Sequence, residues 1–532
     1  MQTTETKRKS IVNFFLKKGL LVSRDLLSYL EDEKNLSGFS RLIEGENSKN
    51  IAVLSDKIKD LFECGQNSHL NWPELEKFKA ASEKKGRDGN NAVFKQILVH
   101  EADSGDKEKA NTGNNVKIIF SYDAAPKKRE ANDFIQYFNN RFLAIEKILK
   151  QRQELKNTTS INRLINKRDR EQISVIGMVH DKHQTKNGNF ILTLEDKTGY
   201  IKVLVNKNKP DLFKIVKDVV LDEVIGIVGV NGDNIIFASN LLFPDVPLTK
   251  EIKKTTEELY ALFLSDLHVG SKNFLEDDFN KFLRWINCEL GNKTQREIAS
   301  KVKYIFIIGD LVDGCGVYPG QEDELVIKDI RDQYSVCADF LSKIPVRIKL
   351  IICPGNHDAM RLAEPQLPLY KDFAEPLYNL PNAIMVSNPA VVNIHSSDNF
   401  PGFDVLVYHG YSFDFYFAEV ESIRNQGGYD RADLLMKFLL QKRHLAPTYT
   451  STLHAPDTDI DPLLIDKVPD FFVSGHIHKA AAANYKNVTL ISGSCWQSKT
   501  SFQEKVGHNP EPSRVPIVNL QTRHIKMLKF GK

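Results

Sequence analysis

Five short apolar segments in the second half of this 532-residue chain each end in a tight turn that carries aspartate, asparagine or histidine. The segments are 261–264, 304–308, 349–353, 405–408 and 471–473, and their length and composition predict buried strands. Because functional sites of α/β proteins form outside the carboxyl ends of strands, five such turns can converge on one place. This feature predicts a domain of sheet and helices over residues 255–532, with its chemistry at the strand ends.

The turns hold residue types that bind divalent metals. They read Ser-Asp-Leu-His at 265–268, Gly-Asp-Leu-Val-Asp at 309–313, Pro-Gly-Asn-His-Asp at 354–358, His-Gly at 409–410 and Ser-Gly-His-Ile-His at 474–478. Aspartate, asparagine and histidine suit Mn²⁺, Fe²⁺ or Zn²⁺. Two such cations joined by one carboxylate lower the pKa of bound water and hold phosphate oxygens for in-line attack. The turns therefore predict a hydrolytic site with two metal ions.

The set DxH, GDxxD, GNHD, HG and GHxH, complete and in this order, resembles the calcineurin-like metallophosphoesterases. The resemblance implies a four-layer α/β/β/α domain and two divalent ions, with Mn²⁺ expected first and Fe²⁺ or Zn²⁺ as alternatives. For one ion, it implies the ligands Asp266, His268, Asp310 and His478. Asp310 would bridge to the second ion, whose other ligands would be Asn356, His409 and His476. His357 would be the general acid that contacts the scissile phosphate, and Asp358 its orienting partner.

Asp313 and two of the cysteines lie in or beside the turns but are not among the expected metal ligands. Asp313 either caps a following helix or supports a metal ligand from behind, and the sequence leaves both readings open. The six cysteines are dispersed without a CxxC pair, so they predict neither a disulfide framework nor a structural zinc site. Cys315 and Cys353 adjoin the turns but stand at no ligand position.

The first 170 residues divide by composition. Residues 1–75 show helical spacing of apolar residues and are expected to form a helical module. Residues 76–130 are expected to be a flexible polar linker, because 101–115 contains no aromatic or branched aliphatic residue. Residues 131–170 predict a basic helical segment, with nine Lys or Arg against three Asp or Glu over 141–170. Such a stripe is either the solvated face of a helix or a track for a phosphate backbone.

Over residues 171–247 the apolar residues recur with a period of two, which is typical of strands. Apolar runs at 175–179, 190–194, 201–205, 224–228 and 235–237, with a helical insert at 210–216 after the third, match the order of an OB-fold barrel. OB-folds bind single-stranded nucleic acid or protein. Because few aromatic residues, such as Phe190 and Tyr200, are available for base stacking, we expect a structural or protein-binding role here.

This order of segments predicts a multidomain α+β protein. It also resembles one particular family among the phosphoesterases. A helical module, a polar linker, an OB-fold and a final phosphoesterase resemble the small subunits of archaeal family D DNA polymerases. Three segments between the turns, at 316–321, 441–447 and 468–470, also resemble this family. The resemblance implies a 3′→5′ exonuclease that proofreads single-stranded or mismatched DNA ends for a separate, large polymerising subunit, which the small subunit also scaffolds.

Two other functions remain open at this stage. A stand-alone metallophosphatase or phosphodiesterase would use the same site, but would have no need of an OB-fold or a basic helix. A non-catalytic scaffold subunit would not need the complete ligand set. The modular organisation further predicts that a chain starting near Asn132 keeps its nuclease activity.

No apolar run approaches the ~20 residues that span a bilayer. The basic N-terminus is followed by an apolar stretch too short for a secretory signal. We therefore expect a cytoplasmic protein without membrane contact.

Overall fold

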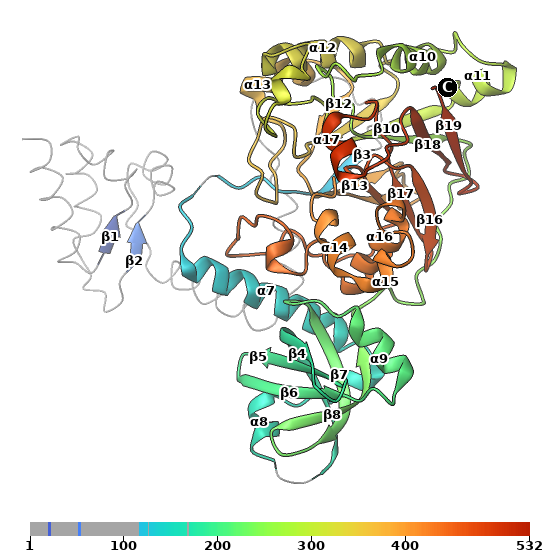
Figure 1. Ribbon diagram of the computed structural model, residues 1–532. Helices are drawn as coiled ribbons and strands as arrows, with labels where there is room; N and C mark the ends of the chain where they lie inside the picture. Colours follow the sequence, from blue (N-terminus) through green and yellow to red (C-terminus); the bar gives the residue numbers. More distant parts are fainter. Residues whose placement is uncertain (1–19, 23–51, 55–115, 126, 168–169, 532) are drawn as a thin grey trace, which may run out of the picture. The chain divides into compact units, whose positions relative to one another are not determined.

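The computed structural model describes residues 20–22, 52–54, 116–125, 127–167 and 170–531 (Figure 1). The chain divides into two compact units, residues 1–108 and 109–532, and each is described by itself. In the first unit the described residues form strands β1 (Leu20–Val22) and β2 (Ala52–Leu54), which pair in parallel. Leu20 and Leu21, predicted to be helical, thus lie in a strand, because a short apolar run suits either element. The rest of the predicted helical module and residues 76–115 lie outside the described residues.

Two six-stranded sheets form the centre of the C-terminal domain within the described residues. The first sheet has the order β12-β11-β10-β9-β18-β19, with strands Ala383–Met385, Lys349–Cys353, Val302–Ile308, Tyr260–Leu264, Arg514–Asn519 and Ile525–Lys529. The second has the order β16-β17-β15-β14-β13-β3, with strands Ala481–Tyr485, Val488–Ser492, Phe471–Ser474, Phe403–Val407, Ala390–Ile394 and Val116–Ser121. All five strands predicted before the polar turns are therefore present.

The two sheets pack face to face and carry helices on their outer faces. In β9, Ala261 and Phe263 face the second sheet, while Leu262 and Leu264 face the helices, because successive strand residues point to opposite sides. The helices beside the first sheet are α10 (Glu276–Ile286), α11 (Lys293–Ser300), α12 (Ile330–Ser342) and α13 (Lys371–Tyr378). Those beside the second are α14 (Phe413–Glu419), α15 (Glu421–Arg424) and α16 (Ala432–Lys442). The predicted four-layer α/β/β/α domain is confirmed.

Strand β3 corrects the boundary of the predicted linker. It lies within 76–130, yet it pairs antiparallel with β13 at the edge of the second sheet. Just after it, the Tyr122 amide donates to Ser387 Oγ, and the Tyr122 hydroxyl donates to Asp457. A chain that starts near Asn132 would lose this strand and both contacts. We therefore expect an active fragment to begin before Val116 and not near Asn132.

A closed barrel of five strands confirms the predicted OB-fold. Its strands are β4 (Gln172–Gln184), β5 (Phe190–Asp196), β6 (Gly199–Val205), β7 (Val224–Asn231) and β8 (Ile235–Leu242), with α9 (Pro210–Lys217) after the third. β4 is longer than the predicted run at 175–179, because its first half pairs with β7 and its second half with β5. A register shift between Val179 and Asp181 marks the change of partner. The barrel closes through this bent strand.

Helix α7 (Ala131–Leu149) begins the predicted basic segment and is followed by a short 3-10 helix (Gln153–Leu155) and by α8 (Ile161–Ile165). It is amphipathic, with Tyr137, Phe142, Ile145 and Leu149 buried. Most of the described basic residues after it are exposed, so both readings of the basic stripe stay open for them. Among the described residues, no helix is long and apolar enough to cross a membrane.

Arg141 of α7 is an exception, because it is fully buried in what we call the junction cluster, which consists of Arg141, His444 and Asp461. Its Nε donates to Asp461 Oδ2 at 2.7 Å, and its Nη1 donates to the Pro447 carbonyl. His444 Nε2 lies 2.7 Å from the same Asp461 oxygen. These contacts fasten α7 to segment 441–447, which also reaches the barrel through the buried pair Lys442–Glu223 at 2.8 Å.

Candidate active site

The predicted ligands lie at the carboxyl ends of five strands, three in the first sheet and two in the second. Asp266 and His268 follow β9, Asp310 follows β10 and Asn356 follows β11. His409 follows β14, and His476 and His478 follow β15. We call these seven residues the strand-end cluster. The structure therefore brings together side chains that are up to 212 positions apart in the sequence, as the sequence predicts.

The backbone of the cluster is folded into a conformation that side chains rarely adopt. Five of the seven residues have left-handed φ angles, namely Asp266 (53°), His268 (51°), Asp310 (50°), His476 (72°) and His478 (54°). A non-glycine residue held in this region costs on the order of 1–3 kcal/mol and persists only where the surroundings enforce it. The tight turns after β9, β10 and β15 thus aim these side chains toward one another at the expense of local stability.

Gly355 shows how closely the third turn approaches its neighbours. A Cβ atom at this position would lie 2.2 Å from Asp310 Oδ1 and 2.8 Å from His409 Cε1. Any side chain here would displace Asp310 or His409. The glycine before Asn356 and His357 is therefore required by the contact between two turns.

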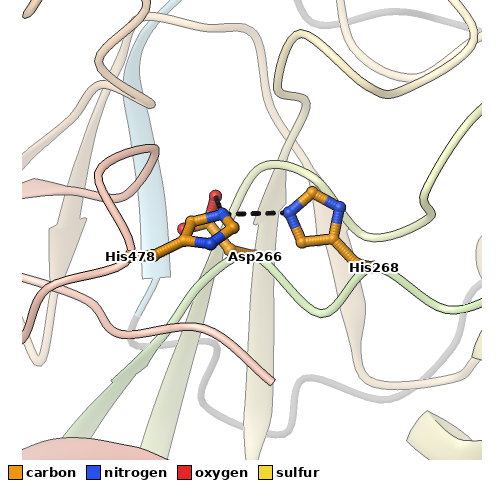
Figure 2. Close-up of side chains that lie close together, drawn as sticks. All are labelled: Asp266, His268 and His478. Atoms are coloured by element: carbon orange, nitrogen blue, oxygen red, sulfur yellow. Dashed lines mark hydrogen bonds and ion pairs between the residues drawn. The ribbon is translucent and has the colours of Figure 1, made fainter. Parts of the chain in front are cut away.

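The first group of candidate ligands contains Asp266, His268 and His478 (Figure 2). The Nε2 atoms of the two histidines face each other at 3.1 Å, and His478 Nε2 lies 3.4 Å from Asp266 Oδ1. One donor atom from each residue can be chosen so that all three lie within 4.8 Å of one another. This is a compact arrangement of two ring nitrogens and a carboxylate, the donor set that suits Mn²⁺, Fe²⁺ or Zn²⁺.

The second group contains Asp310, His409 and His476, with Asn356 beside them. His409 Nε2 lies 3.3 Å from Asp310 Oδ2 and 3.0 Å from Asn356 Oδ1. Asp310 Oδ2 also lies 3.9 Å from His268 Nε2, so one carboxylate faces both groups. This position fits the bridging role that the resemblance implies for Asp310.

The donor set of the second group is chemically incomplete without a cation. His409 Nδ1 lies 2.9 Å from the Ile308 carbonyl and has to donate its hydrogen there. In the neutral ring this leaves a lone pair on Nε2, and both of its near neighbours are oxygens that accept but do not donate. A bound metal ion or an added proton resolves that repulsion. The residues present therefore fit a divalent ion.

The electrostatics of the cluster agree with this fit. Burial would lower the pKa of His409, but the charge of Asp310 and its contact with the ring, the charge of Asp266 and the Ile308 carbonyl together raise the pKa to about 10. Burial would likewise raise the pKa of Asp310, but His409 and His357 hold it well below its usual range. The buried carboxylates thus attract positive charge strongly. A divalent cation would compete with protons for the same place, which makes binding stronger as the pH rises.

Asp313 lies behind a ligand and caps no helix. Its Oδ1 is 3.2 Å from Nδ1 of His268, and Gln497 and Gln321 donate to its two carboxylate oxygens at 2.8 and 3.0 Å. The next helical turn after it begins only at Gln321. A carboxylate behind a metal-binding histidine fixes the ring orientation and raises the basicity of its other nitrogen. Of the two readings left open for Asp313, this geometry favours the support of His268.

His357 lies beside the first group, with its ring centroid 4.7 Å from that of His268. Its Nδ1 is 2.7 Å from the Asp313 carbonyl oxygen, and within the described part of the chain its Nε2 has no hydrogen-bond partner. Asp358 does not make the orienting contact that was expected of it. Its carboxylate instead accepts from the Gly355 amide at 2.8 Å and from the Tyr334 hydroxyl at 3.0 Å, so it holds the turn itself.

Two residues that the sequence did not single out contact ligand histidines. Asp414 Oδ2 of α14 lies 3.1 Å from His476 Nε2, and Gln503 Nε2 of α17 (Ser501–Val506) lies 2.8 Å from His478 Nδ1. Since Nε2 of His476 is occupied by Asp414, its Nδ1 is the atom that remains for a metal. Neither residue belongs to a recognisable turn motif, and only the tertiary structure reveals these contacts.

Comparison with known proteins identifies both domains. Residues 259–480 match the family model described as calcineurin-like phosphoesterase, and residues 173–230 match the OB-fold nucleic acid binding domain.

Three similar relatives carry the description DNA polymerase II small subunit. The one from Methanothermobacter thermautotrophicus is 40% identical over 402 residues, which cover 76% of this chain and 80% of the relative. The one from Archaeoglobus fulgidus is also 40% identical over 402 residues, covering 75% and 78%. The one from Pyrococcus abyssi is 40% identical over 402 residues that cover 75% of this chain and 63% of the relative, which is less than two thirds of its length.

Proposed function

Because this chain belongs to the family of DNA polymerase II small subunits, we propose that its phosphoesterase domain removes nucleotides from the 3′ ends of DNA strands. Membership of this family implies a large polymerase subunit as partner. The substrate would be a single-stranded or mismatched 3′ end, and the activity would proofread for that partner. The observation that carries this proposal is the position of Asp310, whose Oδ2 lies 3.3 Å from His409 in the second group and 3.9 Å from His268 in the first, so that one carboxylate can hold two metal ions close together for phosphodiester hydrolysis.

The proposal assigns each member of the strand-end cluster to an ion. Asp266, His268 and His478 would hold the first ion together with Asp310, and Asp310 would also hold the second with Asn356, His409 and His476. Oxygen and imidazole donors without a thiolate suit Mn²⁺, Fe²⁺ or Zn²⁺, and of these we propose Mn²⁺ first. When bound, two such ions polarise the phosphate and supply a nucleophilic water at neutral pH.

The remaining residues act on the phosphate and on the ligands. His357, with Nδ1 engaged by the Asp313 carbonyl, can direct Nε2 at a phosphate oxygen or at the leaving 3′-oxygen. Asp313 would hold the His268 ring in the orientation that binds metal. Asp358 would keep the turn at Gly355 closed, and thereby keep Asn356 and His357 in place.

The other domains support a DNA substrate and a protein partner. The barrel matches a nucleic-acid-binding family model. The ion pair Lys442–Glu223 joins the barrel to the phosphoesterase domain, and the junction cluster joins α7 to it. We propose that this joined portion scaffolds the large subunit. The proposed domain boundaries are 1–75, 76–115 as a linker, 116–121 as part of the phosphoesterase sheet, 131–170, 171–247 and 255–532.

The test uses the purified full chain with an oligonucleotide that carries a label at its 5′ end and an unpaired 3′ end. With Mn²⁺ we expect a ladder of products that shorten one nucleotide at a time, since the label survives only when digestion starts at the 3′ end. Efficient hydrolysis of p-nitrophenyl phosphate with intact DNA would instead support a stand-alone phosphatase. Two bound metal ions without any hydrolysis would support a non-catalytic scaffold.

A further inference from the structure

A row of aromatic rings leads from the strand-end cluster to the surface. The ring centroids of His478 and His268 lie 5.0 Å apart, and those of His268 and His357 lie 4.7 Å apart. The row continues from His357 to Tyr318 at 6.5 Å, and from Tyr318 to Phe502 at 5.8 Å. The last two rings are stacked, with an angle of 25° between their planes.

The outer two rings come from separate segments that both touch the site. Tyr318 lies in the loop that follows the second turn, and Phe502 lies on α17, directly before Gln503, which contacts His478. The Tyr318 ring is held in place because its hydroxyl donates to Glu324 Oε2 at 2.9 Å. Phe502, in contrast, remains 51% exposed, so an extended apolar ring face stands in water beside the cluster.

We propose that Tyr318 and Phe502 form a stacking surface for the unpaired nucleobase of a strand whose phosphate lies at the strand-end cluster. This inference rests on the proposed function, and it adds how the substrate is recognised. The Tyr318 ring lies 6.5 Å from the ring of His357, the residue proposed to contact the phosphate. Stacking on aromatic side chains accepts any base, because every base has a π-face.

The surroundings of Phe502 fit a nucleic acid better than a protein segment. Phe502 and Lys505 are three positions apart on α17 and therefore lie on the same face of this helix. Lys505 is exposed and can meet the phosphate of a neighbouring nucleotide. Moving a paired terminal base onto this surface would first break its base pair and its stacking, which costs least when the end is mismatched, so the surface would select ends that are frayed or mismatched.

The first experiment measures stacking without hydrolysis. The full chain is titrated, in EDTA, into an oligonucleotide with 2-aminopurine at its 3′ end, whose fluorescence is quenched when the base stacks. Quenching is expected with the native chain and with Phe502→Tyr, and it should disappear with Phe502→Ala. Phe237→Ala removes the same side chain from a comparably exposed position on the barrel, where Phe237 is 43% exposed against 51% for Phe502, and it should leave the signal intact.

The second experiment measures cleavage with Mn²⁺ on two 3′ ends, one carrying an unpaired thymine and one carrying an abasic nucleotide. Phe502→Ala should slow removal of the thymine nucleotide by roughly 10- to 100-fold, the effect of losing one stacked base, and should change removal of the abasic nucleotide far less. Equal slowing of both ends, or quenching that survives Phe502→Ala, would overturn the stacking surface. If the native chain cuts neither end, the proposed nuclease function fails, and the quenching experiment alone decides whether the base stacks.

Discussion

Asp310 and Asp461 are both buried aspartates that face a histidine, yet the two histidines have pKa values on opposite sides of the ordinary one. His409, beside Asp310, has its pKa raised to about 10 by that carboxylate, against the effect of burial. His444, beside Asp461, has its pKa lowered to about 4, first by burial and then by the charge of Arg141. The difference lies in what else touches the carboxylate.

The junction cluster contains its own cation. Arg141 donates to the same oxygen of Asp461 that His444 contacts, so the carboxylate is already neutralised and the histidine stays uncharged. The Ala446 amide donates to His444 Nδ1 at 3.0 Å, so the hydrogen of this neutral ring is on Nε2, where it bonds Asp461. Every polar contact in this cluster pairs a donor with an acceptor. It is complete as a structural unit.

The strand-end cluster has carboxylates and histidines but no buried arginine or lysine among its described contacts. Nε2 of His268 faces Nε2 of His478 at 3.1 Å, and Nε2 of His409 faces oxygens of Asn356 and Asp310 at 3.0 and 3.3 Å. The same residue types therefore form a permanent structural contact where a cationic side chain lies beside them, and a cation-binding site where none does. The two clusters should therefore respond to substitution in different properties.

The largest effect is expected for Asp310→Ala. Because Asp310 faces both ligand groups, its loss should reduce both metal sites and bring hydrolysis to the uncatalysed background. Asp313→Ala is the matched control, since it removes a carboxylate that only supports His268, and such a loss typically costs about 10- to 100-fold. The measurements are single-turnover cleavage, metal content, and the rise in melting temperature on adding Mn²⁺. Comparable activity in the two variants would remove the bridging role from Asp310.

His357→Ala should separate metal binding from catalysis. General acid catalysis is worth roughly 10²- to 10⁴-fold, so the cleavage rate should fall by about that factor while both ions stay bound. Metal content and single-turnover cleavage are measured on the same preparation. A variant that loses a metal ion together with its activity would show that His357 is a ligand.

Arg141→Met should act on stability instead of chemistry. It leaves the buried charge of Asp461 without its cationic partner, with only the neutral donors His444 and the Leu463 amide, and breaking a buried ion pair in this way costs about 3–5 kcal/mol. Thermal unfolding should shift down by several degrees or more, while the folded fraction keeps its metal content. The double variant Arg141→Met/Asp461→Leu removes both charges and should recover part of the loss. Loss of metal in the folded single variant would contradict the independence of the two clusters.

The sequence predicted the strand-end cluster because each ligand stands in a turn directly after its strand, and the carboxyl ends of parallel strands share one edge. It could not predict that Asp414 and Gln503 would reach the ligand histidines, since these contacts depend on how α14 and α17 pack. The contact expected of Asp358 was wrong for a related reason. Neighbours in sequence after a tight turn point in different directions, and the carbonyl of Asp313 reaches His357 instead.

In the N-terminal half, the sequence pattern was misleading about which residues belong to the folded domains. Val116–Ser121 reads as an apolar strand, but the preceding polar stretch made it look like the end of a linker. Its partner β13 lies some 270 positions further along the chain, beyond the reach of any local pattern. Arg141 was likewise counted in an exposed basic stripe, although it is fully buried. Charge alone does not distinguish a surface residue from one that joins two domains.

Glu364 offers a third kind of buried carboxylate and the smallest expected effect. Its near partners are neutral, with the Tyr408 hydroxyl donating to Oε2 at 3.0 Å, and burial raises its pKa to about 7. A raised pKa means that the folded chain holds this proton more tightly than the unfolded chain. The stabilisation is therefore complete below the ordinary value of 4.5 and is lost as the pH rises through about 7.

Glu364→Gln keeps the shape of this side chain but stays neutral at every pH. Relative to the native chain, the variant should become more stable as the pH rises from 5 to 8, by up to about 3 kcal/mol for a shift of this size. The measurement is the difference in melting temperature between the two chains across that pH range, in EDTA, so that metal binding does not contribute. A difference that stays constant with pH would show that Glu364 is already charged in the folded chain, paired with a cation as Asp461 is.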